Sequence, residues 1–150
     1  MKQVVRIRAA RLADCTTCQK LGRVPEISIA PGWYLPVQYY QSVVRGRHIF
    51  LVAETDHRLV GFLIAEKIVA GFLLQYIVVD KSWRKHGVAT GLMTQLDIAA
   101  RKKGAYFLMT YSVLKSQGMA PLLRKYKYRP GQITREWSKG LSPTSRTRNK

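Results

Sequence analysis

The feature that most constrains the fold is an abrupt change of pattern near the middle of the chain. Residues 72–79 are almost continuously apolar and rich in β-branched side chains, which is typical of a strand buried on both faces. After a basic, glycine-containing stretch, apolar residues recur at helical spacing from Val88 to Ala100. Gly104 then provides a stop signal. The pattern predicts a strand, a short loop and a helix in direct succession.

Such a junction is suited to binding an anion. The first backbone N–H groups of a helix have no intrahelical partner, and they point back along the preceding loop. Gly87 removes the side chain that would keep a phosphate at a distance, and the small Ala89 does nearly the same. Arg84, Lys85 and His86 add positive charge. We therefore expect this loop to bind a pyrophosphate through its backbone amides.

The spacing of Arg84, Gly87 and Ala89 after a Val-rich strand resembles the acetyl-CoA-binding motif of the GNAT superfamily of N-acetyltransferases. Members of this family carry Arg or Gln, two further residues, Gly, one residue, and then Gly or Ala. The resemblance implies that acetyl-CoA is the co-substrate. The residues expected to contact it are Ile77, Val78, Val79, Arg84, Lys85, His86, Gly87, Val88, Ala89, Thr90 and, in the last helix, Ser116.

The rest of the chain resembles the same family in the order of its elements, over residues 3–141. Strands are expected at residues 5–10, 48–54, 59–65, 72–79, 105–112 and 133–141, and helices after Asp14, at 36–44, from Val88 and at 115–126. The resemblance implies one α/β domain over residues 1–141, with a central mixed, mostly antiparallel β-sheet flanked by about four helices. Residues 142–150 are polar and basic, and a flexible tail is expected there.

The charge of the chain is the second strong feature. Twenty-six Lys and Arg against eight Asp and Glu give a net charge of +18, far more than solubility requires. A coenzyme site uses only a few of these cations, so the surplus favours an acidic partner such as RNA, the ribosome or an acidic protein. A general basic bias of the surface is the alternative. A polyamine or aminoglycoside acceptor would be repelled unless a local acidic pocket formed.

Cys15 and Cys18 are the only cysteines, in C-x-x-C spacing. Together with Leu21 they share one face of the expected first helix, which favours packing in the core over a functional thiol pair. No histidine is spaced to complete a zinc site with them, so no metal is expected. No apolar run approaches the length of a membrane span, and we expect a cytoplasmic protein without a membrane partner.

Acetyl transfer needs a held thioester, a donor for the developing oxyanion and a route for the amine proton. The family resemblance implies that the thioester lies against the end of the motif strand, with a backbone N–H near Ile77 or Val78 as the oxyanion donor. Many relatives carry a glutamate near the beginning of that strand, but residues 72–75 contain no carboxylate. Glu66 is the candidate base, acting through a water, and Glu54 is the alternative. Tyr111 is a candidate for a water relay.

The resemblance also bears on the acid, the acceptor and the oligomer. Relatives often place a tyrosine near the coenzyme sulfur, but Leu123 stands there in this chain, so Tyr126 is the candidate acid. Trp33 and Tyr34, in a loop rich in proline, are expected to line the acceptor side. The edge of a final strand at residues 133–141 would allow a homodimer.

The sequence therefore predicts a transferase that moves the acetyl group of acetyl-CoA to a primary amine of a peptide, a protein or an anionic molecule. The alternative is a coenzyme-A-binding or catalytically weak GNAT-fold module that binds RNA, the ribosome or another acidic partner.

Overall fold

The computed structural model describes residues 3–27, 31–56, 58–112 and 118–141 of the chain. Three short 3₁₀ helices, η1 (Leu12–Asp14), η2 (Pro25–Ile27) and η3 (Lys81–Trp83), accompany the strands and α-helices of this described part. The strands are β1 (Arg6–Ala9), β2 (Ile49–Thr55), β3 (Arg58–Ile68), β4 (Gly71–Val79) and β5 (Phe107–Thr110), and the α-helices are α1 (Cys15–Leu21), α2 (Val37–Arg45), α3 (Val88–Lys102) and α4 (Met119–Lys125).

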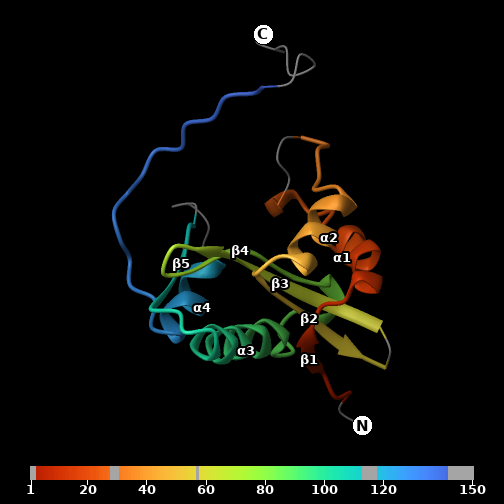
Figure 1. The fold of residues 1–150 in the computed structure, drawn as a ribbon. Helices are drawn as coiled ribbons and strands as arrows, with labels where there is room; N and C mark the ends of the chain where they lie inside the picture. The colour runs from red at the N-terminus through yellow and green to blue at the C-terminus, as the bar shows by residue number, and fades with distance from the viewer. Residues whose placement is uncertain (1–2, 28–30, 57, 113–117, 142–150) are drawn as a thin grey trace.

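The strands form one mixed sheet in the order β1-β2-β3-β4-β5. The first three pairs are antiparallel, and β4 and β5 run parallel because α3 carries the chain across one face of the sheet between them. Helices α1 and α2 cover one face, and α3 and α4 cover the other (Figure 1). The predicted fold class, a mostly antiparallel mixed sheet with helices on both faces, is confirmed.

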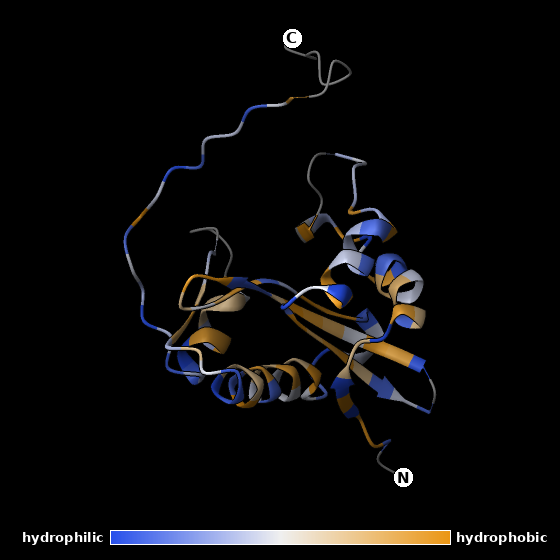
Figure 2. Cartoon of the chain, in the orientation of Figure 1, coloured by the Kyte–Doolittle hydropathy of each residue, from blue (hydrophilic) through white to orange (hydrophobic). Residues whose placement is uncertain are grey.

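Two apolar layers fill the space between the sheet and its helices. Residues Leu92, Met93 and Leu96 of α3 are fully buried against one face, and Tyr40 of α2 is buried against the other. Figure 2 shows the apolar residues concentrated in the strands and on the sheet-facing sides of the helices. The central strand β3 contributes to both layers, which explains its nearly continuous apolar sequence.

The first helix is tied to the sheet by a partly buried ion-pair cluster centred on Arg8. Its Nη1 donates to Oδ2 of Asp14 at 2.7 Å, and its Nε donates to Oε2 of Glu54 at 3.1 Å. These hydrogen bonds raise the pKa of Arg8, and the bond from Arg8 lowers the pKa of Asp14. Because β1, η1 and β2 each supply one member, the cluster fixes where the chain enters α1.

Cys15 and Cys18 are buried on the sheet-facing side of α1, as the core interpretation predicted. Burial raises the pKa of both thiols, and that of Cys18 rises to about 12. A neutral, enclosed thiol is unreactive, so the pair is part of the packing. No helix in the described part of the chain is long and apolar enough to span a bilayer.

The prediction of a final strand at residues 133–141 is wrong for the single chain. These residues form no strand, and the chain leads away from the body after Tyr128 (Figure 1). A strand needs a neighbour that takes up its N–H and C=O groups, and none of the described strands lies beside this segment. The predicted last helix is present as α4, while residues 115–117 and the expected tail at 142–150 lie outside the described residues.

Candidate active site

Strand β4 carries a β-bulge at Gln75. Tyr76 pairs with Ile64 of β3 and Leu74 pairs with Ala65, so Gln75 is an extra residue without a partner opposite it. A bulge of this kind bends the strand and exchanges the sides to which the following residues point. The single polar amide in an otherwise apolar strand thus marks the position where the strand changes direction.

Beyond the bulge, the backbone groups of Ile77 and Val79 point away from β3. The N–H of Asp80 donates to the carbonyl of Val60 on β3 at 2.8 Å, and backbone groups alternate between the two sides of a strand. The carbonyl of Val79 accepts from Nε of Arg84 at 3.3 Å, which is consistent with this direction. The end of β4 therefore offers backbone donors and acceptors on the side that faces away from β3.

On this free side, the pairing of β4 with β5 stops before the end of β4. Their parallel pairing ends at Leu74 and Thr110, where Oγ1 of Thr110 donates to the carbonyl of Leu74 at 2.9 Å. No described strand lies beside β4 past this point. We call the region on this free side of β4, beside the backbone groups of Ile77 and Val79, the wedge.

The loop after β4 is held by Asp80. Its Oδ1 accepts from the backbone N–H of Ser82 at 2.9 Å and from the Ser82 hydroxyl at 2.7 Å, while Oδ2 accepts from Nη2 of Arg58 at 2.8 Å. The bonds from Ser82, followed by that from Arg58, lower the pKa of Asp80. The ionised carboxylate therefore fixes the turn through which β4 leads into α3.

The turn itself ends in two residues with left-handed backbone. Lys85 has φ of 62° and Gly87, the N-cap of α3, has φ of 80°. A Cβ at Gly87 would meet nothing within 4 Å, so the space over the helix terminus is open. The N–H groups of Val88, Ala89 and Thr90 lie in the first turn of α3, where an α-helix provides no acceptor for them. This terminus has the geometry expected of an anion site.

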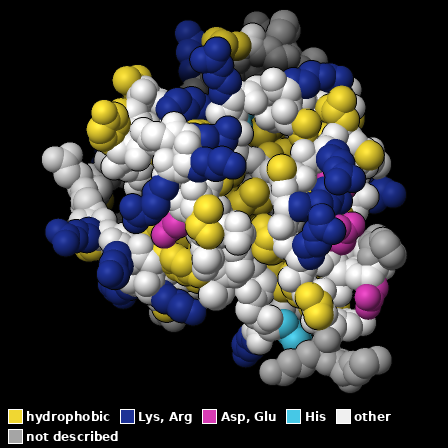
Figure 3. Space-filling model, turned by 60° about the horizontal axis from the view of Figure 1, so that its bottom comes forward, with side chains coloured by type: hydrophobic (Ala, Val, Ile, Leu, Met, Phe, Trp, Pro, Cys, Tyr) yellow, Lys and Arg dark blue, Asp and Glu magenta, His cyan; other side chains and the backbone are white. Residues whose placement is uncertain are grey.

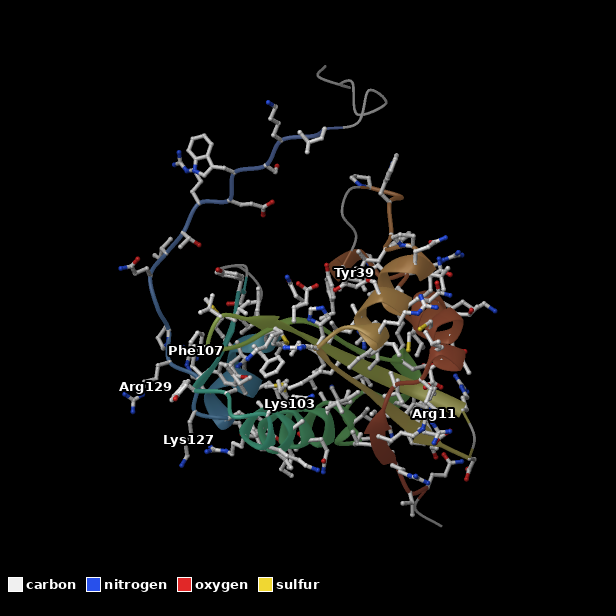
Figure 4. All side chains as sticks on the ribbon, viewed as in Figure 1. Arg11, Tyr39, Lys103, Phe107, Lys127 and Arg129 are labelled. Atoms are coloured by element: carbon white, nitrogen blue, oxygen red, sulfur yellow. The ribbon has the colours of Figure 1, made fainter. Side chains whose placement is uncertain are left out.

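A carboxylate lies at the bulge on the other face of the site. Oε1 of Glu66 accepts from the hydroxyl of Tyr39 at 2.6 Å, and Oε2 accepts from Nε2 of Gln75 at 3.4 Å. Burial, and then the bond to Glu66, raises the pKa of Tyr39, so its hydroxyl stays protonated and donates. Tyr39 reaches the sheet from α2 (Figure 4). Its ring packs edge-on against that of Tyr76, with the ring centroids 6.0 Å apart.

The hydroxyl of Tyr126 lies on α3. It donates to the carbonyl of Thr90 at 2.6 Å and is 2.7 Å from Oγ1 of Thr94. These bonds hold the end of α4 against the first two turns of α3, a contact that we call the clamp. The hydroxyl proton of Tyr126 is donated to the backbone carbonyl of Thr90. Its role as the acid stays a prediction beside this structural role, and Ser116 lies outside the described residues.

Residues 46–130 match the family described as Acetyltransferase (GNAT) domain, a range that contains the wedge, the loop and the clamp between α3 and α4. The chain belongs to this GNAT family. No curated protein sequence matches the chain.

Solved GNAT structures share the whole fold. The aminoglycoside N-acetyltransferase AAC(6')-Iy in complex with CoA aligns with a TM-score of 0.76 at 17% identity, over 94% of this chain and 98% of that one. The aminoglycoside 6'-N-acetyltransferase AAC(6')-Ih from Acinetobacter baumannii aligns with a TM-score of 0.73 at 17% identity, over 93% of this chain and 100% of that one. The ribosomal-protein-alanine N-acetyltransferase from Brucella melitensis biovar Abortus 2308 aligns with a TM-score of 0.73 at 19% identity, over 91% of this chain and 100% of that one. At these identities the likeness establishes the fold.

The remaining predicted residues of the GNAT site lie around the wedge or away from it. Tyr111 follows β5 directly, beyond the last residue paired with β4, and its side chain is 68% exposed. Trp33 is 67% exposed and Tyr34 is half-buried, while the neighbouring Leu35 anchors their loop in the core. The alternative base, Glu54, is engaged by Arg8. The roles of these side chains stay predictions.

Two residues of the site were missed by sequence reasoning. Tyr39 lies 27 residues before Glu66 and reaches it only because α2 packs over the sheet. Gln75 carried a signal, because it is an amide inside an apolar strand, and such a residue often marks a bulge. Among the described residues, no group of three His, Cys, Asp or Glu is placed to hold a metal ion.

Proposed function

We propose that this GNAT protein transfers the acetyl group of acetyl-CoA to a primary amine. The observation that carries the proposal is the continuity of the wedge between β4 and β5 with the open N-terminus of α3. Backbone groups along β4 suit the amide-bearing arm and thioester of the co-substrate, and the first turn of α3 suits its pyrophosphate. Arg84, Lys85 and His86, all exposed beside this turn, supply the positive charge.

The reaction forms a C–N bond between the amine nitrogen and the thioester carbonyl and breaks the C–S bond, which releases coenzyme A. The amine gives up a proton, and the thiolate gains one. The N–H of Ile77 faces the wedge and is the proposed oxyanion donor, whereas Val78 directs its backbone toward Phe62 of β3. The alternation of backbone groups thus favours Ile77 of the two predicted donors.

Glu66 is the proposed base, acting through a water. Its carboxylate comes from β3, but the bond to Gln75 brings it beside the bulge of β4. Tyr39 holds one oxygen of this carboxylate and leaves the other available to a weaker donor at 3.4 Å. A carboxylate held in this manner has a defined orientation, which a general base requires.

The proposed acceptor is the amine of a peptide or protein, or of an anionic molecule. Asp14 and Glu54 are bound to Arg8, and Asp80 is bound to Arg58, whereas Glu66 is a carboxylate beside the bulge of β4. A single carboxylate suits one amino group. It is a poor match for a polycation approaching a chain of net charge +18.

The charge supports a second candidate, in which a catalytically weak GNAT module binds RNA or another acidic partner. Figure 3 shows Lys and Arg side chains over much of one face of the molecule, with few Asp or Glu among them. Tyr106 is exposed three residues after Lys103, and aromatic side chains beside cations suit single-stranded nucleic acid.

The experiment that separates the two is an acceptor screen that follows thiol release from acetyl-CoA at low and high salt. It includes peptide amines, small anionic amines and aminoglycosides, with free coenzyme A binding measured in parallel. We expect turnover with a peptide or anionic amine, with a KM that rises with salt. Coenzyme A binding without turnover on any amine, together with RNA binding that weakens steeply with salt, would select the binding module.

A further inference from the structure

One long stretch of the chain carries positive charge and no carboxylate. From Ile98 to Arg135 the sequence contains nine Lys and Arg and no Asp or Glu. The stretch runs from the last turns of α3 through β5 and α4 into the segment that follows. Among the described residues, the cations paired with carboxylates are Arg8 and Arg58, and the described cations of this stretch form no ion pair. Their charge is therefore available to a partner.

The fold gathers cations from two separate parts of this stretch. Arg101 lies in the last turn of α3, and Lys103 is the C-cap of that helix. Lys127 and Arg129 follow α4, and the side chain of Tyr128 between them packs in the apolar layer on the α3 side of the sheet. Because Tyr128 is held inward, the basic side chains on either side of it are exposed.

Two exposed aromatic side chains lie beside these cations. The N–H of Tyr106 donates to the carbonyl of Ala70 at 2.9 Å, so the sheet holds its backbone, yet its side chain is 90% exposed. The next residue, Phe107, begins β5 and is 45% exposed. An exposed ring on a held backbone is a surface on which an unpaired base can stack.

The aromatic and basic side chains lie on the same edge of the molecule. Figure 4 shows Phe107, Lys127 and Arg129 together at this edge, and they line one hollow with Arg101 and Tyr106. Six Lys and Arg and two carboxylates line the hollow, so its local charge is positive. We call this surface the basic edge, and its members are Arg101, Lys103, Tyr106, Phe107, Lys127 and Arg129.

We propose that the basic edge binds a single-stranded nucleic acid. Cations that contact phosphates, together with exposed rings that stack on bases, are the combination by which proteins hold single strands without reading their sequence. An acidic protein would use the same cations but would leave Tyr106 without a base to stack on.

The basic edge and the coenzyme loop lie at opposite ends of α3. This helix has 15 residues, which separates its two ends by about 20 Å. A strand on the basic edge therefore leaves the start of α3 free for coenzyme A. The inference does not depend on the proposed function, because the strand would bind whether or not the protein transfers acetyl groups.

The test is the fluorescence anisotropy of labelled oligouridine of about 12 nucleotides, titrated with the protein at several salt concentrations. With about four cations on phosphates, we expect the affinity to fall roughly fiftyfold between about 50 and 200 mM salt. Oligothymidine is the second probe, and the tighter of the two identifies the strand as RNA or DNA. Excess coenzyme A should leave the affinity unchanged.

Two quadruple variants separate a local site from the general charge of the protein. Replacing the four cations of the basic edge by Gln should weaken binding by about tenfold or more and flatten its salt dependence. The control replaces four exposed cations on the α1 and α2 side of the sheet and should change the affinity less than about twofold. Thermal unfolding shows whether each protein is folded. The substitutions are Arg101→Gln, Lys103→Gln, Lys127→Gln and Arg129→Gln for the edge, and Lys20→Gln, Arg23→Gln, Arg45→Gln and Arg47→Gln for the control.

Tyr106 tests the stacking part of the proposal. Tyr106→Ser should weaken binding by about fivefold or more, and Tyr106→Trp, which keeps a stacking surface, should bind like the wild type. Because Tyr106 is exposed, neither change disturbs the core.

The proposal is overturned if the wild-type protein does not bind either oligonucleotide at low salt, or if the two quadruple variants lose the same affinity. An unchanged affinity of the Tyr106→Ser protein, or displacement of the strand by coenzyme A, overturns it as well. Oligoglutamate of the same charge that binds as tightly would identify an acidic protein as the partner instead. Thiol release from acetyl-CoA is measured in a separate assay, so a failure of the proposed function is distinguishable from a failure of this inference.

Discussion

The hydroxyl of Tyr39 lies 2.6 Å from Oε1 of Glu66 and joins helix α2 to the third strand of the sheet. The bond ties helix α2 to the bulge of β4, where the motif strand itself has no carboxylate. A neighbouring strand thus supplies the group that relatives often carry on the motif strand. In the proposed mechanism, the base therefore comes from a different position than in those relatives.

Glu66→Gln tests this carboxylate. The amide keeps the size of the side chain but accepts a proton poorly, so we expect kcat to fall about a hundredfold with unchanged affinity for coenzyme A. Tyr39→Phe should lower kcat less and alter the pH profile, because Tyr39 orients Glu66 without touching the substrate. Glu136→Gln changes an exposed carboxylate in the C-terminal segment after α4 and is the control for charge. Full activity of the Glu66→Gln protein in steady-state assays would remove Glu66 from the mechanism.

Gly87 tests the coenzyme loop against a matched glycine. Gly87 and Gly104 have φ of 80° and 73°, and a Cβ at either would enter open space. A Trp at each position should cost about 1–2 kcal/mol of stability through backbone strain. Only Gly87→Trp should weaken coenzyme A binding, by roughly tenfold or more, as measured by calorimetry. Equal affinities for the two variants would contradict a pyrophosphate at the start of α3.

Arg8→Met tests the cluster that anchors α1. Removing the shared cation leaves the carboxylates of Asp14 and Glu54 without their common partner. We therefore expect the free energy of unfolding, measured with urea at neutral pH, to fall by about 2 kcal/mol. The pKa of Asp14 is lowered in the folded protein, so its contribution is present above the unfolded value of 3.8 and is lost as the pH falls through the folded value. The difference in the free energy of unfolding between the wild type and the Arg8→Met variant should therefore become smaller below about pH 4. Arg58→Met breaks a more exposed pair with Asp80 and should have a smaller effect.

Thiol reactivity tests the core interpretation of Cys15 and Cys18. With the pKa of Cys18 raised to about 12, its thiol is neutral and enclosed at pH 8, so both cysteines should react with a disulfide reagent only as the protein unfolds. Because burial disfavours the Cys18 thiolate, the folded state keeps its full stability below the unfolded pKa of 9.0. The free energy of unfolding should fall as the pH rises from 9.0 toward the folded pKa of about 12. Rapid reaction in the native state would favour a functional thiol pair instead.

Much of the fold was predictable because it depends on local pattern. The apolar run into β4 and the helical spacing from Val88 specify the strand, the loop and α3, and Gly87 at positive φ explains why the motif needs its glycine. The last segment shows the limit of such reasoning. Residues 133–141 alternate like a strand, but whether they pair depends on a distant edge that no local pattern reports.

The site was less predictable than the fold, for the same reason. Glu66 could be selected as a carboxylate near the motif strand, but its partner Tyr39 is set by the packing of α2. The place of Tyr126 near the end of the last helix makes it the predicted acid. Its hydroxyl donates to the carbonyl of Thr90, a contact that depends on the packing of α4 on α3 and not on local sequence.

The most direct test of the whole account is the change in backbone amide resonances when coenzyme A is added to the isotopically labelled protein. The account predicts saturable binding, with the largest shifts at Gly87, Val88 and Ala89 and a second group at Ile77. Saturable binding that leaves these amides unmoved, or no binding at all, would contradict the assignment of the wedge and the α3 terminus as the acetyl-CoA site.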